Sequence, residues 1–149
     1  MTFVSDIVDK ISEEGENHPA EVSRVVQTGL SKILSEMLDG CTDIAGAMIS
    51  SSDGLAWAER LQQGLDPHRF AAMSSALLAL ADNVTKEVHS GAVKDVLIQS
   101  DDGNVFIMHA GNNLLLTVFS KAASNIGMPL AHARKAAEDI AALNLNPGA

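Results

Sequence analysis

Residues 95–120 have the sequence DVLIQSDDGNVFIMHAGNNLLLTVFS, in which three apolar runs are separated by two short polar breaks. The breaks, Asp102-Gly103 and Gly111-Asn112-Asn113, consist of residue types that tolerate the positive φ of tight hairpin turns. Parallel strands need a crossover connection of a dozen or more residues, which such breaks cannot supply. The stretch therefore predicts three antiparallel strands, at 95–100, 105–110 and 114–120.

The first and last of these runs differ in how they distribute polar residues. The run LLLTVF at 114–119 is apolar on both faces, as a strand covered on both sides would be. The run at 95–100 has a short apolar centre between Lys94-Asp95 and Gln99-Ser100. Charged and polar ends suit an edge strand. We therefore expect 114–120 at the centre of the sheet and 95–100 at its edge.

A second hairpin is predicted upstream, in GAMISSSDGLAWA at residues 46–58. The serines at 50–52 raise two functional alternatives, a nucleophile or a phosphate-binding loop. Both normally lie where a strand leads into a helix, whereas here strands are expected on both sides, at 44–50 and 55–60. Asp53 would also repel phosphate, while Asp53-Gly54 suits a tight turn. The hairpin interpretation is favoured.

Helices are predicted before, between and after the two hairpins. Asp66-Pro67 is a start signal for the longest helix, about 67–89. Another is expected to begin near Pro19 and to end near Gly40, and a last one at 129–143, with a short amphipathic helix at 3–13. The chain is thus expected to be α+β, with one five-stranded antiparallel sheet in the order strand-strand-helix-strand-strand-strand. We divide it into an acidic arm at 1–21, a domain at 22–143 and a tail at 144–149.

The long helix has two stripes that could be buried. One carries large apolar residues and is expected to face the core: Phe70, Met73, Leu77, Leu80, Ala81, Val84 and Val88. The other is composed mainly of small residues, which would allow a second helix to approach closely: Ala71, Ala72, Ser75, Leu78, Ala79 and Asp82. An alanine-rich exposed face is the alternative. Because Leu78 favours burial, we expect the second stripe to form an isologous dimer.

Composition excludes several functional classes. A formal charge of −9 argues against a nucleic-acid surface, and six acids against one base at 1–21 give that arm a net −5. The arm is either a solvated tail or a contact for a basic partner. With 46% hydrophobic residues the chain should be globular, and no run is long enough to span a bilayer, so a cytoplasmic location and no membrane insertion are expected.

Motifs typical of metal-binding, nucleotide-binding and catalytic sites are also missing from the sequence. The five histidines and the single Cys41 lack the spacing of a metal site, and each histidine is expected at the surface or a cap, with His109 the one expected to be partly buried. There is no phosphate-binding or dinucleotide-binding glycine fingerprint. We therefore expect no metal, no cofactor and no catalytic residue. Trp57 is expected to pack at its strand end, with a partner contact as the alternative.

Three stretches together resemble the Roadblock/light-chain-7 family. They are DIAGAMISSSDGLAWAERL, DPHRFAAMSSALLALADNV and VKDVLIQSDDGNVFIMHAGNNLLLTVFSKAASNIGMPLAHARKAAEDI, within residues 22–142. The resemblance implies a Roadblock/profilin-like sandwich, with the long helix on one face of the sheet and the terminal helices on the other. It also implies dimerisation through the middle helix and the edge strand, near Val96 and Ile98. Bacterial MglB-like members bind and regulate a small Ras-like GTPase; eukaryotic relatives are dynein light chains or scaffolds.

The leading hypothesis is therefore a non-enzymatic homodimer that binds a small Ras-like GTPase. Arg60 and Arg69 are the nearest candidates for contacts with that GTPase, although ordinary surface charge is their alternative role. A small-molecule sensor of similar architecture is the second hypothesis. Hydrolysis by the serine cluster is the third.

Overall fold

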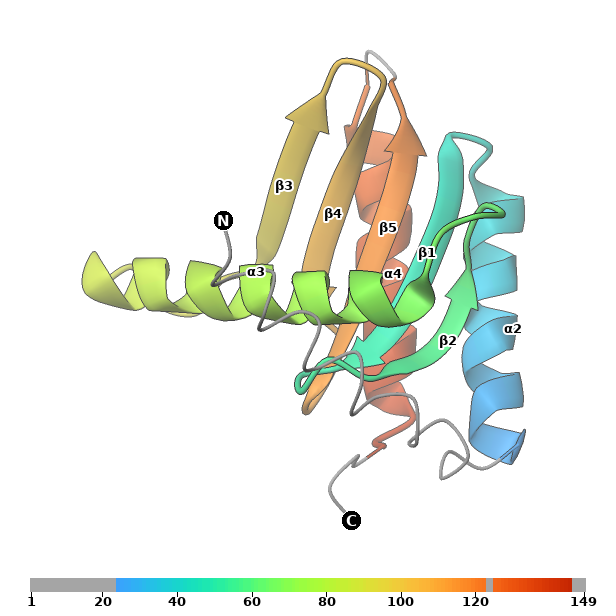
Figure 1. Ribbon diagram of the computed structural model, residues 1–149, viewed down its shortest axis with the longest axis horizontal. Coiled ribbons are helices and arrows are strands. Elements are labelled where there is room, and N and C mark those ends of the chain that lie inside the picture. The colour runs from blue at the N-terminus through green and yellow to red at the C-terminus, as the bar shows by residue number, and fades with distance from the viewer. Residues whose placement is uncertain (1–23, 123–124, 146–149) are drawn as a thin grey trace.

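The computed structural model describes residues 24–122 and 125–145, and Figure 1 shows the arrangement of its elements. The predicted acidic arm, its short helix at 3–13 and residues 146–149 of the tail lie outside the described residues. The elements are α2 (Arg24–Gly40), β1 (Ile44–Ser51), β2 (Ala56–Arg60), α3 (Pro67–Glu87), β3 (Asp95–Ser100), β4 (Gly103–His109), β5 (Leu114–Lys121) and α4 (Gly127–Ala142). Each lies within a few residues of a predicted element.

The strands form one antiparallel sheet in the order β2-β1-β5-β4-β3. Strand β5 is central and buried along most of its length, and among the described strands β3 pairs only with β4. The expectations for a covered central strand and for an edge at 95–100 are confirmed. The two hairpins meet through the β1–β5 pairing, which joins segments far apart in the chain.

Helices cover both faces of the sheet (Figure 1). Helix α3 lies across the strands on one face, while α2 and α4 pack side by side on the other. The larger core lies on the α2–α4 side, where Leu34, Ile49, Leu116 and Ile140 are fully buried. The α+β sandwich implied by the family resemblance is therefore confirmed.

The β1–β2 connection is a hairpin, as predicted. The Gly54 amide donates to the Ser51 carbonyl at 3.0 Å, and Gly54 has a φ of +87°, a conformation that glycine tolerates best. The Leu55 amide donates to Ser51 Oγ at 3.1 Å, so this hydroxyl is used within the turn. Trp57 is the extra residue of a β-bulge, because Ala56 and Ala58 pair with the successive residues Ser50 and Ile49.

Candidate functional site

Helix α3 begins where the sequence predicted. The Asp66 carboxylate accepts a hydrogen bond from the His68 amide at 3.0 Å, and Pro67 opens the first turn. The residues of α3 that face the sheet are small except for one leucine: Ala71, Ala72, Ser74, Ser75 and Leu78 are all buried. This side therefore packs closely on the sheet.

Hydrogen bonds fix the same side of the helix. The Ser75 hydroxyl donates to the Ser52 carbonyl, and the Thr117 hydroxyl donates to Ser74 Oγ at 2.9 Å. Farther along, His109 Nε2 and the Asp82 carboxylate lie 3.1 Å apart and connect α3 to β4. These contacts fix which side of α3 faces the sheet.

The opposite side of α3 is apolar and exposed, which reverses the prediction. We define the α3 stripe as the residues expected in the core that instead remain exposed, with these exposed fractions: Met73 43%, Leu77 39%, Leu80 61%, Val84 56% and Val88 65%. Phe70 and Ala81 are half-buried. The predicted core stripe is therefore wrong at these five residues, because small side chains such as Ala71 and Ala72 pack against the sheet in their place. The prediction is confirmed at Phe70, which packs against the buried cluster of Met48, Ala56 and Ala71.

The predicted dimer residues must be corrected accordingly. Ala71, Ala72, Ser75 and Leu78 are covered by the chain's own sheet, so another copy cannot reach them in this structure. Of the remainder, Ala79 and Ile98 are exposed and Asp82 and Val96 are half-buried. These four stay available as predicted contacts.

The spacing of the α3 stripe suits contact with another helix. Its residues follow i, i+4, i+7 and i+11, and Val88 comes just after the last helical residue. When steps of four and three residues alternate, the side chains form one line along the helix that can face a partner helix, as in coiled coils. Within the described residues, no element of the chain covers this seam.

The edge strand β3 contacts α3 on the sheet side of the helix and also carries exposed apolar residues. Leu97 and Ile98 are 46% and 37% exposed, and the outer side of β3 pairs with no described strand. Figure 1 shows α3 extending beyond β3. A 21-residue helix is about 31 Å long, whereas five strands span about 19 Å. The C-terminal part of the stripe thus projects past the edge of the sheet.

An ion pair joins β3 to helix α4 on the opposite face of the sheet from α3. Arg134 on α4 donates to the Asp95 carboxylate at 2.5 Å, and the Asp95 side chain is only 9% exposed. The hydrogen bond from Arg134 to Asp95 and the attraction between their charges raise the pKa of the Arg134 guanidinium above its ordinary value. The edge strand is thereby held at its first residue.

The predicted GTPase contacts do not come together. Trp57 packs against the core on the α2 side, and Arg60 donates to Ser35 Oγ on α2 at 3.3 Å. Arg69 is exposed on the first turn of α3. Only Arg69 therefore lies on the helix that carries the stripe.

The described residues contain no cluster of three or more His, Cys, Asp or Glu side chains that could hold a metal ion. His109 was expected to be the partly buried histidine, but its side chain is 44% exposed at the end of β4, whereas His68 and His132 are half-buried. The choice of His109 is therefore wrong. Among residues 24–122 and 125–145, no helix has the length and hydropathy to cross a membrane.

Comparison with known proteins decides the family. The Roadblock/LC7 domain model matches residues 30–120, which is more than half of the chain. This chain belongs to the Roadblock/LC7 family. The matched region of the Roadblock/LC7 domain runs from α2 to the end of β5 and includes the α3 stripe and the edge strand.

Individual relatives agree with this assignment. The uncharacterized protein MJ0714 of Methanocaldococcus jannaschii is 26% identical over 119 residues, covering 80% of this chain and 99% of that protein. The Roadblock/LC7 domain from Streptomyces avermitilis superposes with a TM-score of 0.70 at 19% identity, covering 78% and 98%. The gliding protein MglB from Thermus thermophilus gives 0.71 at 15% identity, covering 81% and 92%. The two structures show that the fold is shared.

Sequence reasoning missed the α3 stripe as an exposed surface. Both sides of α3 are apolar, so hydrophobic periodicity cannot tell which side of the helix packs on the sheet. A usable signal was side-chain size, since small residues in a row permit close packing against a sheet as well as against a helix.

Proposed function

We propose that this Roadblock/LC7 domain is a non-catalytic homodimer that binds and regulates a small Ras-like GTPase. The observation that carries the dimer is the α3 stripe, a seam of large apolar side chains that no described element covers, together with the outer edge of β3, which pairs with no described strand. Exposed apolar patches of this kind mark interaction surfaces. The proposal includes a cytoplasmic location, since Ras-like GTPases act inside cells.

A two-fold arrangement would satisfy both surfaces at once. Two β3 edges could pair antiparallel, and the two α3 helices would then pack side by side on the same face of a continuous sheet. The projecting end of each α3, with Val84 and Val88, would reach over the β3 edge of the other copy. Burying one such side chain fully contributes about 1.5–3 kcal/mol, so several in a row would support a stable dimer.

The GTPase as partner is supported by family membership and by the fold shared with MglB. The MglB-like members to which the sequence is similar regulate such a GTPase. Regulation would proceed by binding one nucleotide state more tightly than the other, because a ligand shifts an equilibrium only through differential affinity. Arg69 is the retained candidate contact; we assign no catalytic group to this chain.

For the boundaries of the functional unit, we keep the prediction made from the sequence. We propose a domain at 22–143, an arm at 1–21 and a tail at 144–149. Residues 24–122 and 125–142, which include all the described helices and strands, lie within that domain.

The decisive test uses purified full-length protein and each Ras-like GTPase of the same organism, loaded with GDP or a GTP analogue. We expect at least one GTPase to be retained by the immobilised protein in one nucleotide state and not in the other. Failure of every GTPase to bind in both states would refute the proposal. Equal binding in both nucleotide states would support a role as a scaffold and would refute nucleotide-dependent regulation.

A further inference from the structure

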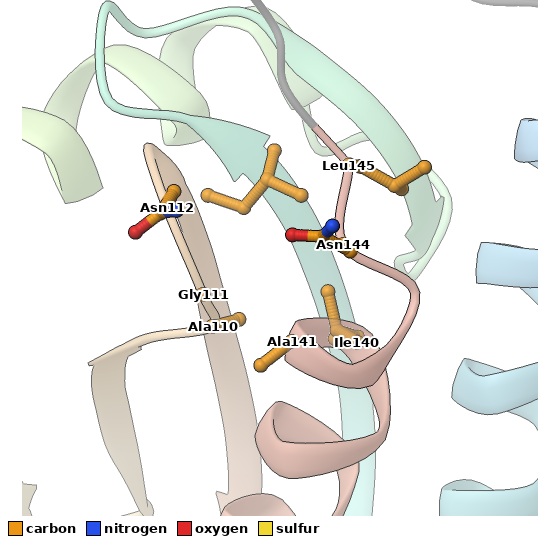
Figure 2. Close-up of a pocket in the computed structure, with 8 residues that line it drawn as sticks. Ala110, Gly111, Asn112, Ile140, Ala141, Asn144 and Leu145 are labelled. Carbon is orange, nitrogen blue, oxygen red and sulfur yellow. The ribbon is translucent and has the colours of Figure 1, made fainter.

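Two hollows at opposite ends of the strands differ in what they expose. The hollow between the β4–β5 turn and the end of α4 (Figure 2) includes Ala110, Leu114 and Ile140, which are almost fully buried, so it offers a ligand little apolar surface. The other hollow, about 450 Å³, lies where the start of α3 meets the ends of the strands and has more accessible apolar residues. We name it the α3-start hollow and define it by six of its lining residues: Leu65, Phe70, Asp102, Val105, Phe119 and Lys121.

The floor of the α3-start hollow is apolar and can be reached from solvent. Leu65 is 39% exposed, and Phe70, Val105 and Phe119 are half-buried. The rings of Phe70 and Phe119 meet edge to face with centroids 5.3 Å apart, so the hollow lies on the face of the sheet that α3 covers only in part (Figure 1). Val105 pairs with Phe119 in the β4–β5 register, so both side chains lie on this face. A ligand in the hollow would therefore contact aromatic and aliphatic side chains directly.

Two glycines leave this part of the sheet without side chains. Gly46 pairs with Phe119 from β1, and Gly103 pairs with Lys121 from β4. A Cβ added to either glycine would lie 2.8 Å from a backbone carbonyl oxygen of a neighbouring strand. A larger residue at either position would therefore have to move a strand, and the space beside Phe119 and Lys121 stays open.

The rim carries one charge of each sign. Lys121 follows Phe119 by two residues on β5, so both side chains point to the same face of the sheet. Asp102 directly precedes Gly103, the residue that pairs with Lys121. Asp102 and Lys121 are the only charged side chains among the described residues of the lining, and within residues 24–122 and 125–145 neither has a hydrogen-bond or ion-pair partner. Both charges are therefore available to a ligand at the mouth of the hollow.

We propose that the α3-start hollow binds a free α-amino acid with a large apolar side chain. The ammonium group of the ligand would pair with Asp102 and its carboxylate with Lys121, since hydrogen bonds between opposite charges are the strong ones. Its side chain would lie against Phe70, Val105 and Phe119, where an aromatic ring can also pack edge to face. A ligand with a single charge would leave one rim group without a counter-charge, and a ligand without an apolar side chain would leave the floor in water. This proposal rests neither on the GTPase nor on the dimer.

The test is a titration of the isotope-labelled full chain with L-phenylalanine, followed by amide NMR. We expect shifts confined to the hollow, at Gly103, Val105, Phe119 and Lys121. Glycine has both charges but no side chain, so it should bind roughly tenfold or more weakly, because the burial of the ring is lost. 3-Phenylpropionate lacks the ammonium group and phenethylamine lacks the carboxylate, and each should bind roughly two- to fivefold more weakly than phenylalanine, the range for one exposed charge pair.

Substitutions test the two charges separately. Asp102→Asn should weaken the binding of phenylalanine by roughly two- to fivefold and should not weaken that of 3-phenylpropionate, which has no ammonium group. Lys121→Gln should weaken the binding of 3-phenylpropionate and should not weaken that of phenethylamine, which has no carboxylate. Asp101→Asn is the matched control, because it makes the same change of charge at a neighbouring residue outside the lining of the hollow, and it should bind phenylalanine like the unsubstituted chain.

Three results would overturn the proposal. The first is the absence of shifts at these residues with phenylalanine at millimolar concentration. The second is an equal loss of phenylalanine binding in Asp101→Asn and Asp102→Asn, which would show that the general charge of the protein, and not a contact with Asp102, affects the ligand. The third is that phenylalanine shifts the signals of the α3 stripe in place of those of the hollow, which would place an apolar ligand on a different surface.

Discussion

Gly46 illustrates how a single residue supports the fold. A Cβ built on Gly46 would lie 2.8 Å from the carbonyl oxygen of Arg60, which belongs to the neighbouring strand. That contact is with backbone, so it can be relieved only by moving β1 away from β2. The requirement for glycine here comes from close approach, since Gly46 is not among the glycines with positive φ.

We therefore predict that Gly46→Ala lowers the free energy of unfolding by about 1–3 kcal/mol, as overpacking does in well-packed interiors. Gly29→Ala is the matched control, because Gly29 lies in helix α2 and its added Cβ would meet nothing within 4 Å. This control should gain about 0.5–1 kcal/mol from helix propensity. Urea denaturation measures both, and a Gly46→Ala variant as stable as Gly29→Ala would contradict the steric argument.

At the scale of elements, α3 has an unusual distribution of side chains. Its sheet-facing side carries alanine, serine and one leucine, while its outward side carries methionine, leucine and valine. A helix normally buries its larger apolar residues, so this orientation is stable only because small residues allow close packing and hydrogen bonds to Ser52 and Thr117. The exposed seam is consistent with an element that completes its packing in a dimer.

Leu80→Asp tests that role, since Leu80 is 61% exposed in the single chain. We expect light scattering to give the mass of a monomer, with the circular dichroism of a folded protein, because a carboxylate in the seam would be desolvated on dimerisation. Met128→Asp, on α4 and 55% exposed, should leave the mass of the dimer unchanged. A dimer that persists in Leu80→Asp would rule out the α3 stripe as its interface.

At the scale of the whole molecule, stability and self-association should be linked. If the seam is covered only in the dimer, folding and assembly share the same apolar surface, and mass action makes stability depend on concentration. We predict that a tenfold rise in protein concentration stabilises the folded state by about 1.4 kcal/mol per dimer. Urea midpoints measured across a hundredfold concentration range would test this, and a constant midpoint would indicate that the dimer does not contribute to stability.

Much of the architecture follows from local sequence. Turn residues such as Asp53-Gly54 and Asp102-Gly103, the Asp66-Pro67 helix start and the apolar runs between them predicted the described elements and their antiparallel pairing. The covered run at 114–119 and the polar ends of 95–100 predicted which strand is central and which is at the edge. These signals are local because φ preferences, helix capping and two-residue alternation act over a few residues.

Which side of α3 faces the sheet was decided only by the tertiary structure. Hydrophobicity allowed both stripes, and the choice depends on the distance between helix and sheet and on partners such as Ser52 and Thr117, which are remote in sequence. The α3-start hollow has the same origin, because it requires the start of α3 to meet the end of β5. The sequence by itself thus determined the elements and the family, whereas long-range packing decided which surfaces remain free to bind.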